Sequence, residues 1–592
     1  MKKPLLARLF ERVNGRVDWH RLPTWAGLLN LIAFRDVLRA HNLHDTWTPG
    51  GLKRRAPDEQ IDPALIRFRQ PDGAYNDLDH PDMGRAGTRF GRNVPCAQAS
   101  PSTETFLTPN PREISVRLMQ RDEFKPATTL NLLAAAWIQF QTHDWFNHER
   151  DHGTPIEIPL ADGHGWFENP MRFPRTKPDH TRCDDDCDLP PTFINTESHW
   201  WDASSIYGST KEKQLQLRSH VDGKLIVEDG RLPFDPDTGF AMTGFSENWW
   251  VGLGLLHTLF ACEHNAICDR LREAYPDWSD DELFGTAQLI NSALMAKIHT
   301  VEWTPAIIAH PVLKIGMRAN WWGLAEERLH RMFGRISKSD VISGIPGSDP
   351  HHHGAPYQLT EEFVAVYRLH PLIPDEVNVR SAETGEHLKT FPFQDVVLRK
   401  AEKIVGQGIT AEDMWYSFGI QHPGAVTLHN FPKFLCDLTL PDGVRLDLAA
   451  VDIIRDRERG IPRYNQFRRL LHLKPASSFA DLTANPDWAA ELEDVYGDVE
   501  LVDLQVGMAA ETPPRGFGFS DTAFRVFILM ASRRLKSDRF LTSCYTPEYY
   551  TQIGLDWVAN NGMSSILLRH YPALEQTLEG ISNPFAPWRE IG

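Results

Sequence analysis

The chain has 592 residues, and its 79 acidic side chains outnumber its 62 lysines and arginines, which gives a net charge of −17. A general nucleic-acid-binding protein needs a basic face that replaces phosphate counterions, so this charge argues against that class. With 41% hydrophobic and 24% charged residues, the composition is that of a folded protein rather than a disordered one. We therefore expect a folded protein without a nucleic-acid partner.

The number of cysteines and the length of the apolar stretches indicate in which cellular compartment the protein is located. Seven cysteines scattered over the chain do not form the dense framework of a small secreted protein. The first apolar stretch is interrupted at Arg8, whereas a signal peptide needs about 7–15 apolar residues. The stretches 129–140 and 249–262 are shorter than the ~20 residues that span a bilayer. We therefore predict a cytoplasmic protein with no signal peptide and no transmembrane helix.

Residues 1–124 are predicted to form N-terminal helices followed by an extended arm. Leu28, Leu31 and Phe34 recur every three residues, as on the buried face of a helix. Because basic residues precede this segment, the pattern is also typical of a helix that lies on a membrane surface, and peripheral membrane contact stays open. Residues 50–125 are rich in proline, glycine and charge, and we expect them to wrap around the rest of the protein.

Residues 125–592 are predicted to form one large helical domain. Strand patterns in this region are short and few. Helical patterns are long and recur at 128–150, 247–274, 280–300, 359–370, 394–406, 411–419, 463–472 and 521–535. The fold class is therefore mainly α.

The segment 148–152 matches the H-E-x-x-H motif, in which two histidines on one helical face bind zinc and Glu149 acts as base. Gly153 and the following Pro155 end any helix at once, and the residues enclosed by the motif are charged. We favour a chance match, and keep a zinc hydrolase as an alternative.

Tyr367 and His370 lie three residues apart, which places them on one face of a helix that Pro374 ends. A histidine near a helix end can bind a metal through one nitrogen while an acceptor holds the other. Taken alone, such a pair is more often a packing contact.

Six segments in a fixed order carry more information than any one of them: 141–148, 200–209, 263–265, 367–370, 457–465 and 531–535. Together they resemble the peroxidase–cyclooxygenase superfamily of haem enzymes, and most closely its fatty-acid α-dioxygenase branch. The resemblance extends from about residue 15 to about residue 575. It implies a predominantly helical fold around a haem b, which we expect to be bound non-covalently.

The resemblance also implies how the haem is held. His370 would be the proximal iron ligand and His143 the distal histidine. Asn465 would accept the N–H of the proximal imidazole and fix its tautomer.

A calcium site is implied beside the distal histidine. Carboxylate, hydroxyl and carbonyl oxygens are the ligands that Ca²⁺ prefers. The implied ligands are Asp144, Ser198, Asp202, Ser204 and the backbone carbonyl of Trp200.

Peroxidases of this superfamily place an arginine beside the distal histidine, but no Arg or Lys occurs from Leu232 to Asp269. The cation that assists cleavage of the peroxide O–O bond is therefore missing from its expected place. The α-dioxygenases and cyclooxygenases instead use a tyrosine radical, which the resemblance assigns to Tyr367. An activating peroxide would oxidise the haem, which would oxidise Tyr367. The radical would abstract hydrogen from a long-chain fatty acid, and O₂ would add at carbon 2 to give a 2-hydroperoxy fatty acid.

The segment 297–304 resembles the α-dioxygenase segment that holds the substrate carboxylate, through His299 and Thr304. Arg534 would complete this clamp, since a charge-assisted bond to a carboxylate contributes about 1.5–3 kcal/mol. The sequence alone does not separate Arg534 from its neighbours Arg533 and Arg539.

Two further functions remain as alternatives to the α-dioxygenase. One is a haem peroxidase that oxidises small reductants with H₂O₂. The other is a non-enzymatic haem sensor or carrier.

Overall fold

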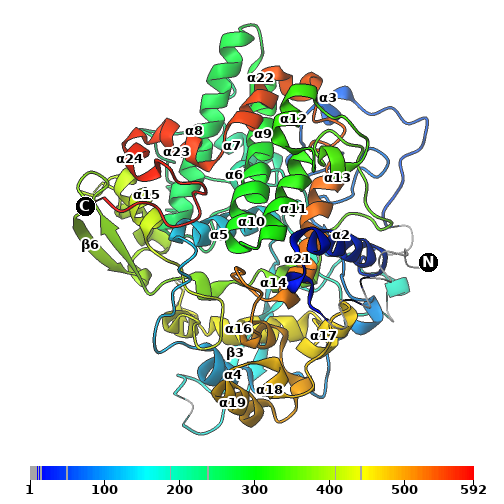
Figure 1. Cartoon of the computed structure of the whole chain (residues 1–592), viewed down its shortest axis with the longest axis vertical. Coiled ribbons are helices and arrows are strands. Elements are labelled where there is room, and N and C mark those ends of the chain that lie inside the picture. The colour runs from blue at the N-terminus through cyan, green and yellow to red at the C-terminus, as the bar shows by residue number, and fades with distance from the viewer. Residues whose placement is uncertain are drawn as a thin grey trace.

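A computed structural model describes residues 10, 13, 17–47, 51–163, 165–186, 189–236, 239–406, 408–440 and 443–591. The regular structure is mostly helical, and the predicted mainly α fold is confirmed (Figure 1). In the described residues the strands form four separate antiparallel pairs. The pairs are β1 (Thr88–Arg89) with β4 (Ile194–Asn195), β2 (Arg150–Ile158) with β3 (Met171–Thr176), β5 (Glu376–Arg380) with β6 (His387–Pro392), and β7 (Leu438–Thr439) with β8 (Arg445–Leu446).

The centre of the molecule is built from long helices. Helices α8 (Val251–Ala274) and α9 (Asp280–Ile298) pack against each other in the upper half of Figure 1. Helix α5 (Leu132–Trp145) packs against α8, and nearly all of its side chains are buried. A helix that is apolar on every side belongs in the interior. This explains why α5 shows no amphipathic pattern in its sequence.

Three other helices contribute to the site described below: α14 (Glu361–Val366), which is followed directly by Tyr367, α16 (Leu448–Glu458) and α21 (Asp521–Ser537), which carries Arg534.

Three predicted helices differ from the structure. The predicted helix 359–370 is shorter, because α14 ends at Val366 and His370 begins a separate 3-10 turn, so Tyr367 and His370 do not lie on one helix. The predicted helix 128–150 ends at Trp145, because the chain enters strand β2 at Arg150. In place of the predicted helix 394–406 there are two short 3-10 turns, η7 (Phe393–Asp395) and η8 (Leu398–Lys403), and Leu398 at the start of the second has a φ of 52°.

The predicted N-terminal helix is present as α2, whereas the wrapping arm stays a prediction. Helix α2 (Thr24–His41) buries Leu28, Leu31 and Phe34, whereas the basic residues before position 10 lie outside the described residues. Between 51 and 125 the helices are short: α3 (Pro63–Arg67), α4 (Pro111–Ile114) and two further single turns. The domain boundary at residue 124 stays a prediction. Among the described residues, no helix is both long and apolar enough to cross a membrane.

The arm holds the start of helix α14. The amide of Gly91 donates to the carbonyl of Leu359 at 2.8 Å. The buried carboxylate of Glu362 accepts from the guanidinium of Arg92 at 3.3 Å and from the amide of Asn93 at 2.6 Å. Because α14 leads directly to Tyr367, these contacts fix the approach to the candidate site.

We predict that Glu362→Ala lowers the stability of the protein by about 3–5 kcal/mol, because the buried guanidinium of Arg92 loses its carboxylate. The shift of a urea unfolding curve followed by circular dichroism measures this loss. Arg54→Ala is the control, since the Arg54–Asp79 pair on the same arm is exposed and such pairs contribute less than about 1 kcal/mol. Equal losses for the two variants would contradict the role of Glu362.

Candidate active site

His143 lies in the last turn of α5, with its ring 4.8 Å from that of Phe245. Its Nδ1 atom is buried without a hydrogen-bond partner. Burial lowers the pKa of His143 to about 3, so the imidazole is neutral near pH 7. A buried, unpartnered and neutral imidazole nitrogen is available to a ligand that the interior would enclose.

His370 begins the 3-10 turn η6 (His370–Leu372), and its Nδ1 lies 2.7 Å from Oδ2 of Asp452 on α16. Arg368 donates to the other oxygen of Asp452 at 2.7 Å. Although burial opposes ionisation of Asp452, these two partners hold its pKa below the usual value. Because a carboxylate accepts the Nδ1 proton, the opposite nitrogen, Nε2, is left for a metal.

The prediction that Asn465 holds the proximal imidazole is wrong. The Asn465 amide lies on α17 (Tyr464–Leu470), where its oxygen accepts from the amide of Ala476 at 2.8 Å. Its nitrogen donates to the carbonyl of Ala476 at 2.9 Å and to Glu500 at 3.1 Å. The Asn465 side chain therefore fastens the chain that follows α17, and Asp452 holds His370 instead.

Tyr367 follows the last residue of α14 and is nearly buried among aromatic rings. Its ring centroid lies 5.2 Å from Trp145 and 4.6 Å from Phe363. Burial raises the pKa of Tyr367 despite the opposing charge of Arg534. The phenol therefore keeps its hydrogen at physiological pH, as a source of a hydrogen atom must.

A small internal cavity joins the residues predicted to act on the substrate. Tyr367, His299 and Arg534 all line it, from three separate elements of the fold. The space open to water in it is about 10 Å³, room for about one water molecule. The remaining walls are largely apolar and include Trp145, Trp201, Thr300, Met317, Phe363 and Ala531.

Arg534, on α21, is buried with its guanidinium against two indole rings that are nearly perpendicular to each other. Its Cζ atom lies 4.2 Å from the ring centroid of Trp145 and 4.4 Å from that of Trp201. Nε and Nη2 have no hydrogen-bond partner. A buried cation with unused donors is a site for an anion.

The neighbouring arginines have their donors occupied. Arg533 donates to backbone carbonyls of the loop 352–358. Arg539 donates to the carbonyls of Asn76, Ile66 and Tyr75 and to the Cys544 sulfur. Among the three, the hydrogen bonds therefore favour Arg534 as the carboxylate ligand.

His299 opens a π-helical turn, η5 (His299–Trp303), in which the amide of Thr304 donates to the His299 carbonyl. This i to i+5 bond places Thr304 one turn below His299, and explains a spacing that does not match one face of an α-helix. The Thr304 hydroxyl is buried without a partner.

The ring of His299 is oriented by Trp137 on α5. The Trp137 indole lies 3.2 Å from Nδ1 of His299, and an indole N–H only donates. Burial lowers the pKa of His299 well below its usual value, and Arg534 adds to this effect. The neutral ring therefore carries its proton on Nε2, where it can donate to a ligand.

The predicted calcium ligands gather where α5 meets the loop 198–204. The Ser204 hydroxyl donates to Oδ1 of Asp144 at 3.1 Å, while Oδ2 of Asp144 has no partner. The Ser204 amide lies 3.2 Å from Oδ1 of Asp202, and Ser198 accepts from the amide of Trp200 at 3.1 Å. Burial raises the pKa of Asp144, and the nearby Asp202 raises it further. Two buried carboxylates of like charge favour a bound cation.

The zinc motif is not assembled. The residues from Arg150 onward form strand β2, and Nε2 of His148 lies 3.1 Å from the carboxylate of Glu361. Glu149 instead pairs with Lys177 on the surface. No group of three or more metal-binding side chains is found in the described parts of the chain.

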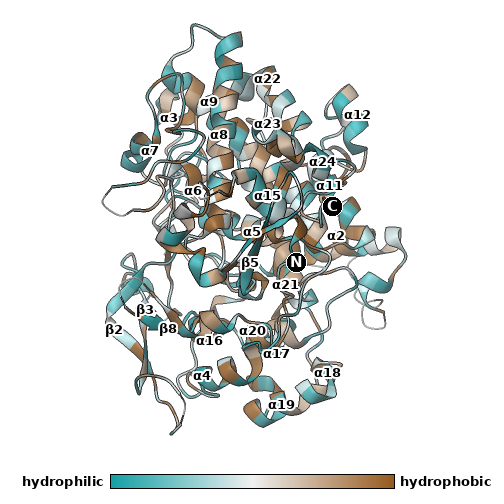
Figure 2. Cartoon of the chain, turned by 90° about the vertical axis from the view of Figure 1, so that its left-hand side faces the viewer, coloured by the Kyte–Doolittle hydropathy of each residue, from teal (hydrophilic) through white to brown (hydrophobic). Residues whose placement is uncertain are grey.

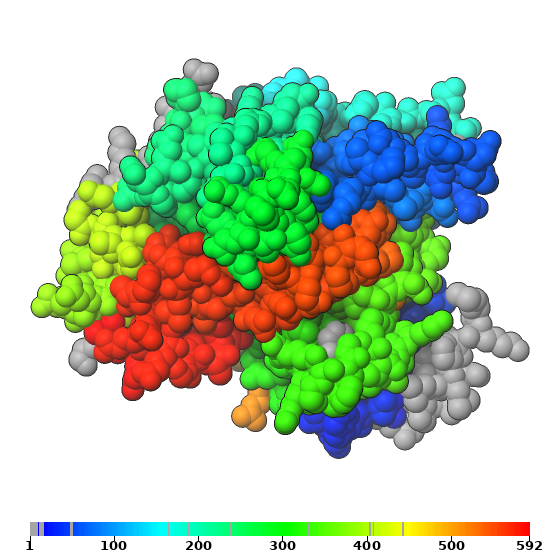
Figure 3. Space-filling view, turned by 90° about the horizontal axis from the view of Figure 1, so that it is seen from above, coloured from blue at the N-terminus to red at the C-terminus, as the bar shows by residue number. Residues whose placement is uncertain are grey.

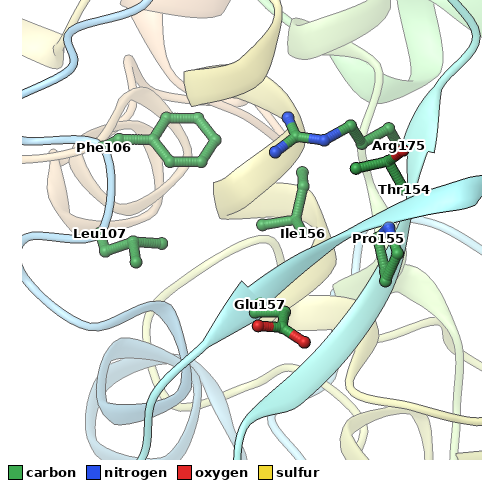
Figure 4. A pocket seen from close by; sticks show the side chains of 7 residues that line it. All are labelled: Phe106, Leu107, Thr154, Pro155, Ile156, Glu157 and Arg175. Carbon is green, nitrogen blue, oxygen red and sulfur yellow. The ribbon is translucent and has the colours of Figure 1, made fainter.

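A second, open hollow of about 460 Å³ lies between the arm and the β2–β3 pair (Figure 4). Phe106, Leu107 and Ile156 give it an apolar wall, with Arg175 at one side. It contains none of the predicted site residues. The small internal cavity, not this hollow, is therefore the candidate active site.

Several side chains of the site carry no recognisable sequence signal. Asp452 stands among apolar residues in the segment 448–454. This apolar surrounding is the only sequence feature that indicates a buried partner for its carboxylate. Trp137, Trp145 and Trp201 read as core residues, and only the fold brings them to His299 and Arg534.

Comparison with known proteins identifies the family. Residues 68–581 match the model of the animal haem peroxidases. The α-dioxygenase PIOX of Oryza sativa is 38% identical over 96% of this chain and 93% of its own. The α-dioxygenase 1 of Arabidopsis thaliana is 36% identical over 98% of this chain and 92% of its own.

A solved structure agrees with this match. The crystal structure of Oryza sativa fatty acid α-dioxygenase with palmitic acid has a TM-score of 0.91 and 36% sequence identity, and the match covers 99% of this chain and 98% of that one. The chain therefore belongs to the animal haem peroxidase family, within its α-dioxygenase branch.

Proposed function

We propose that this protein is a haem-dependent fatty-acid α-dioxygenase that adds O₂ at carbon 2 of a long-chain fatty acid. The main support is that Tyr367, His299 and Arg534 line one cavity, in which Arg534 has unpartnered donors. An anionic head group and a tyrosine hydroxyl would therefore meet in the same small space. The related rice structure, with palmitic acid, supports the same class of substrate.

The residues present fit a non-covalently held haem b. His143 offers a buried nitrogen without a partner, and the Asp452 carboxylate leaves Nε2 of His370 for the iron. When bound and activated by a peroxide, the haem supplies the one-electron oxidation of the Tyr367 phenol. Asp144, Ser198, Asp202, Ser204 and the Trp200 carbonyl would hold Ca²⁺ beside the distal helix, which would balance the two buried carboxylates.

The protein's own residues then determine the position of oxygenation. Arg534 and His299, which line the cavity, hold the carboxylate, whereas Thr304, expected in the same clamp, is not among the lining residues. Carbon 2 is then the first carbon that the Tyr367 radical reaches. The radical removes one hydrogen atom from carbon 2, and O₂ adds to the carbon radical. The peroxyl radical takes the hydrogen atom back from Tyr367, which gives the 2-hydroperoxy acid and restores the tyrosyl radical. No external reductant is consumed in this cycle.

A peroxidase acting on small reductants has less support. In the described structure the ring contacts of His143 are with Phe245, and the segment 232–269 contains no Lys or Arg. The cation that would assist O–O cleavage is therefore missing from this segment. A non-enzymatic haem sensor or carrier, in turn, would have no need of a carboxylate clamp beside a buried tyrosine.

We predict that Tyr367→Phe abolishes fatty-acid-dependent O₂ uptake, because phenylalanine has no hydroxyl hydrogen to give and regain. Peroxide-dependent oxidation of guaiacol by the same variant should persist, since it needs the haem site and not Tyr367. An oxygen electrode and absorbance of oxidised guaiacol measure the two activities. Sustained O₂ uptake by the variant would rule out the tyrosyl mechanism.

Arg534→Gln should lower kcat/KM for palmitate about 10- to 150-fold, the equivalent of losing a charge-assisted bond of about 1.5–3 kcal/mol. Methyl palmitate is the control substrate, because this ester presents no anion to the guanidinium. The wild-type preference for the acid over the ester should largely disappear in the variant. A preserved preference would assign the carboxylate to another residue.

Trp137→Phe should lower kcat/KM for palmitate about 3- to 10-fold, because Nδ1 of His299 loses its donor and the Nε2 proton is no longer fixed. Guaiacol oxidation should be unchanged. Trp19→Phe is the matched control, since it removes a buried indole bond to the carboxylate of Asp521, which opens α21 thirteen residues before Arg534. If both variants lost the same activity, Trp137 would act only through packing.

A further inference from the structure

Large apolar side chains are exposed on one side of the molecule, on α2 and on helix α12 (Glu326–Phe333) with the residues after it. Phe333 is 68% exposed and Trp25 is 64% exposed. We call this surface the α2–α12 face. It comprises Trp25, Leu29, Leu329, Met332, Phe333 and Ile336.

Helix α11 (Pro311–Trp322) joins the two parts of this face, because it packs against both α2 and α12. Arg35 of α2 donates to the side chain of Asn320 at 3.2 Å. Arg318 of α11 pairs with Glu327 of α12 at 2.9 Å. Figures 2 and 3 show α2 and α12 on the same side of the molecule.

The apolar side of α12 is not used for packing within the chain. Leu329, Met332 and Phe333 are spaced three and four residues apart, as on a core-facing stripe, yet all three are exposed. The opposite side carries charged residues. An exposed apolar stripe beside charge is typical of a helix that lies in a membrane interface.

The charge around the face is opposite in sign to that of the whole chain. Residues 311–340 contain six Lys and Arg against three Asp and Glu, whereas the chain has a net charge of −17. Lys314, Arg328 and Lys338 are exposed in this segment. A basic rim around an apolar centre is complementary to anionic lipid head groups above an acyl layer.

The position of α11 connects this face to the candidate active site. Met317 of α11 lines the internal cavity, while Lys314 and Arg318 of the same helix are exposed. We propose that the α2–α12 face docks on an anionic lipid bilayer and admits fatty acid from it. The docking is inferred from the surface residues alone, whereas the delivery of substrate also rests on the proposed function.

Flotation of the purified holoenzyme with lipid vesicles tests this inference. We expect binding to phosphatidylcholine vesicles that contain 30% phosphatidylglycerol, and at least tenfold weaker binding to pure phosphatidylcholine or at high salt. The double substitution Met332→Glu and Phe333→Glu should lower binding at least tenfold. Phe167→Glu is the matched control, because Phe167 is 53% exposed but lies outside the face, and it should bind like the wild type.

Three results would overturn docking: no vesicle binding by the wild type, an equal loss in the Phe167 variant, or a dimer in light scattering that the double substitution dissociates. O₂ uptake with dissolved short-chain fatty acid should be unchanged in the double variant. If vesicle binding followed the prediction but no fatty acid supported O₂ uptake, the proposed function would fail and the docking surface would remain.

Discussion

The buried cation of Arg534 is the constraint on which the rest of the site depends. A guanidinium removed from water is costly unless something offsets the loss of hydration. Here the rings of Trp145 and Trp201, which are nearly perpendicular to each other, lie 4.2 and 4.4 Å from it, and each cation–π contact contributes about 0.5–2 kcal/mol. Two nitrogens nevertheless lack partners, so the fold holds the cation in place and leaves its remaining donors to a ligand.

Burial also keeps neutral His299 and Tyr367, which line the cavity with Arg534, and the predicted distal histidine His143. His143 and His299 have lowered pKa values and Tyr367 has a raised one, each chiefly because the interior disfavours charge. A carboxylate head group is then the natural anion for the cavity, since it would meet the cation, while the space of about 10 Å³ is too small to hold the alkyl chain as well. Neutral imidazoles and an un-ionised phenol suit hydrogen-atom transfer better than acid–base chemistry.

Much of this arrangement could be predicted from sequence. Apolar periodicity located the long helices, and the ordered segments indicated His370, Tyr367 and Arg534. The hydrogen bonds between side chains from distant segments could not be predicted from the sequence. Asn465 stands in the recognised segment, but it bonds Ala476, and the acceptor for His370 is Asp452 on the preceding helix. The choice of Arg534 over Arg533 depended on which donors were already used, which no spacing reveals. The motif 148–152 failed because the chain turns there into a strand.

The position of the new C–O bond tests the central claim most directly. Purified holoenzyme would be incubated with palmitate under ¹⁸O₂, and the products, reduced to alcohols, analysed by mass spectrometry. The clamp beside Tyr367 predicts 2-hydroxypalmitate that carries one ¹⁸O atom on carbon 2. Label at any other carbon, or peroxide turnover with no labelled fatty acid, would contradict it.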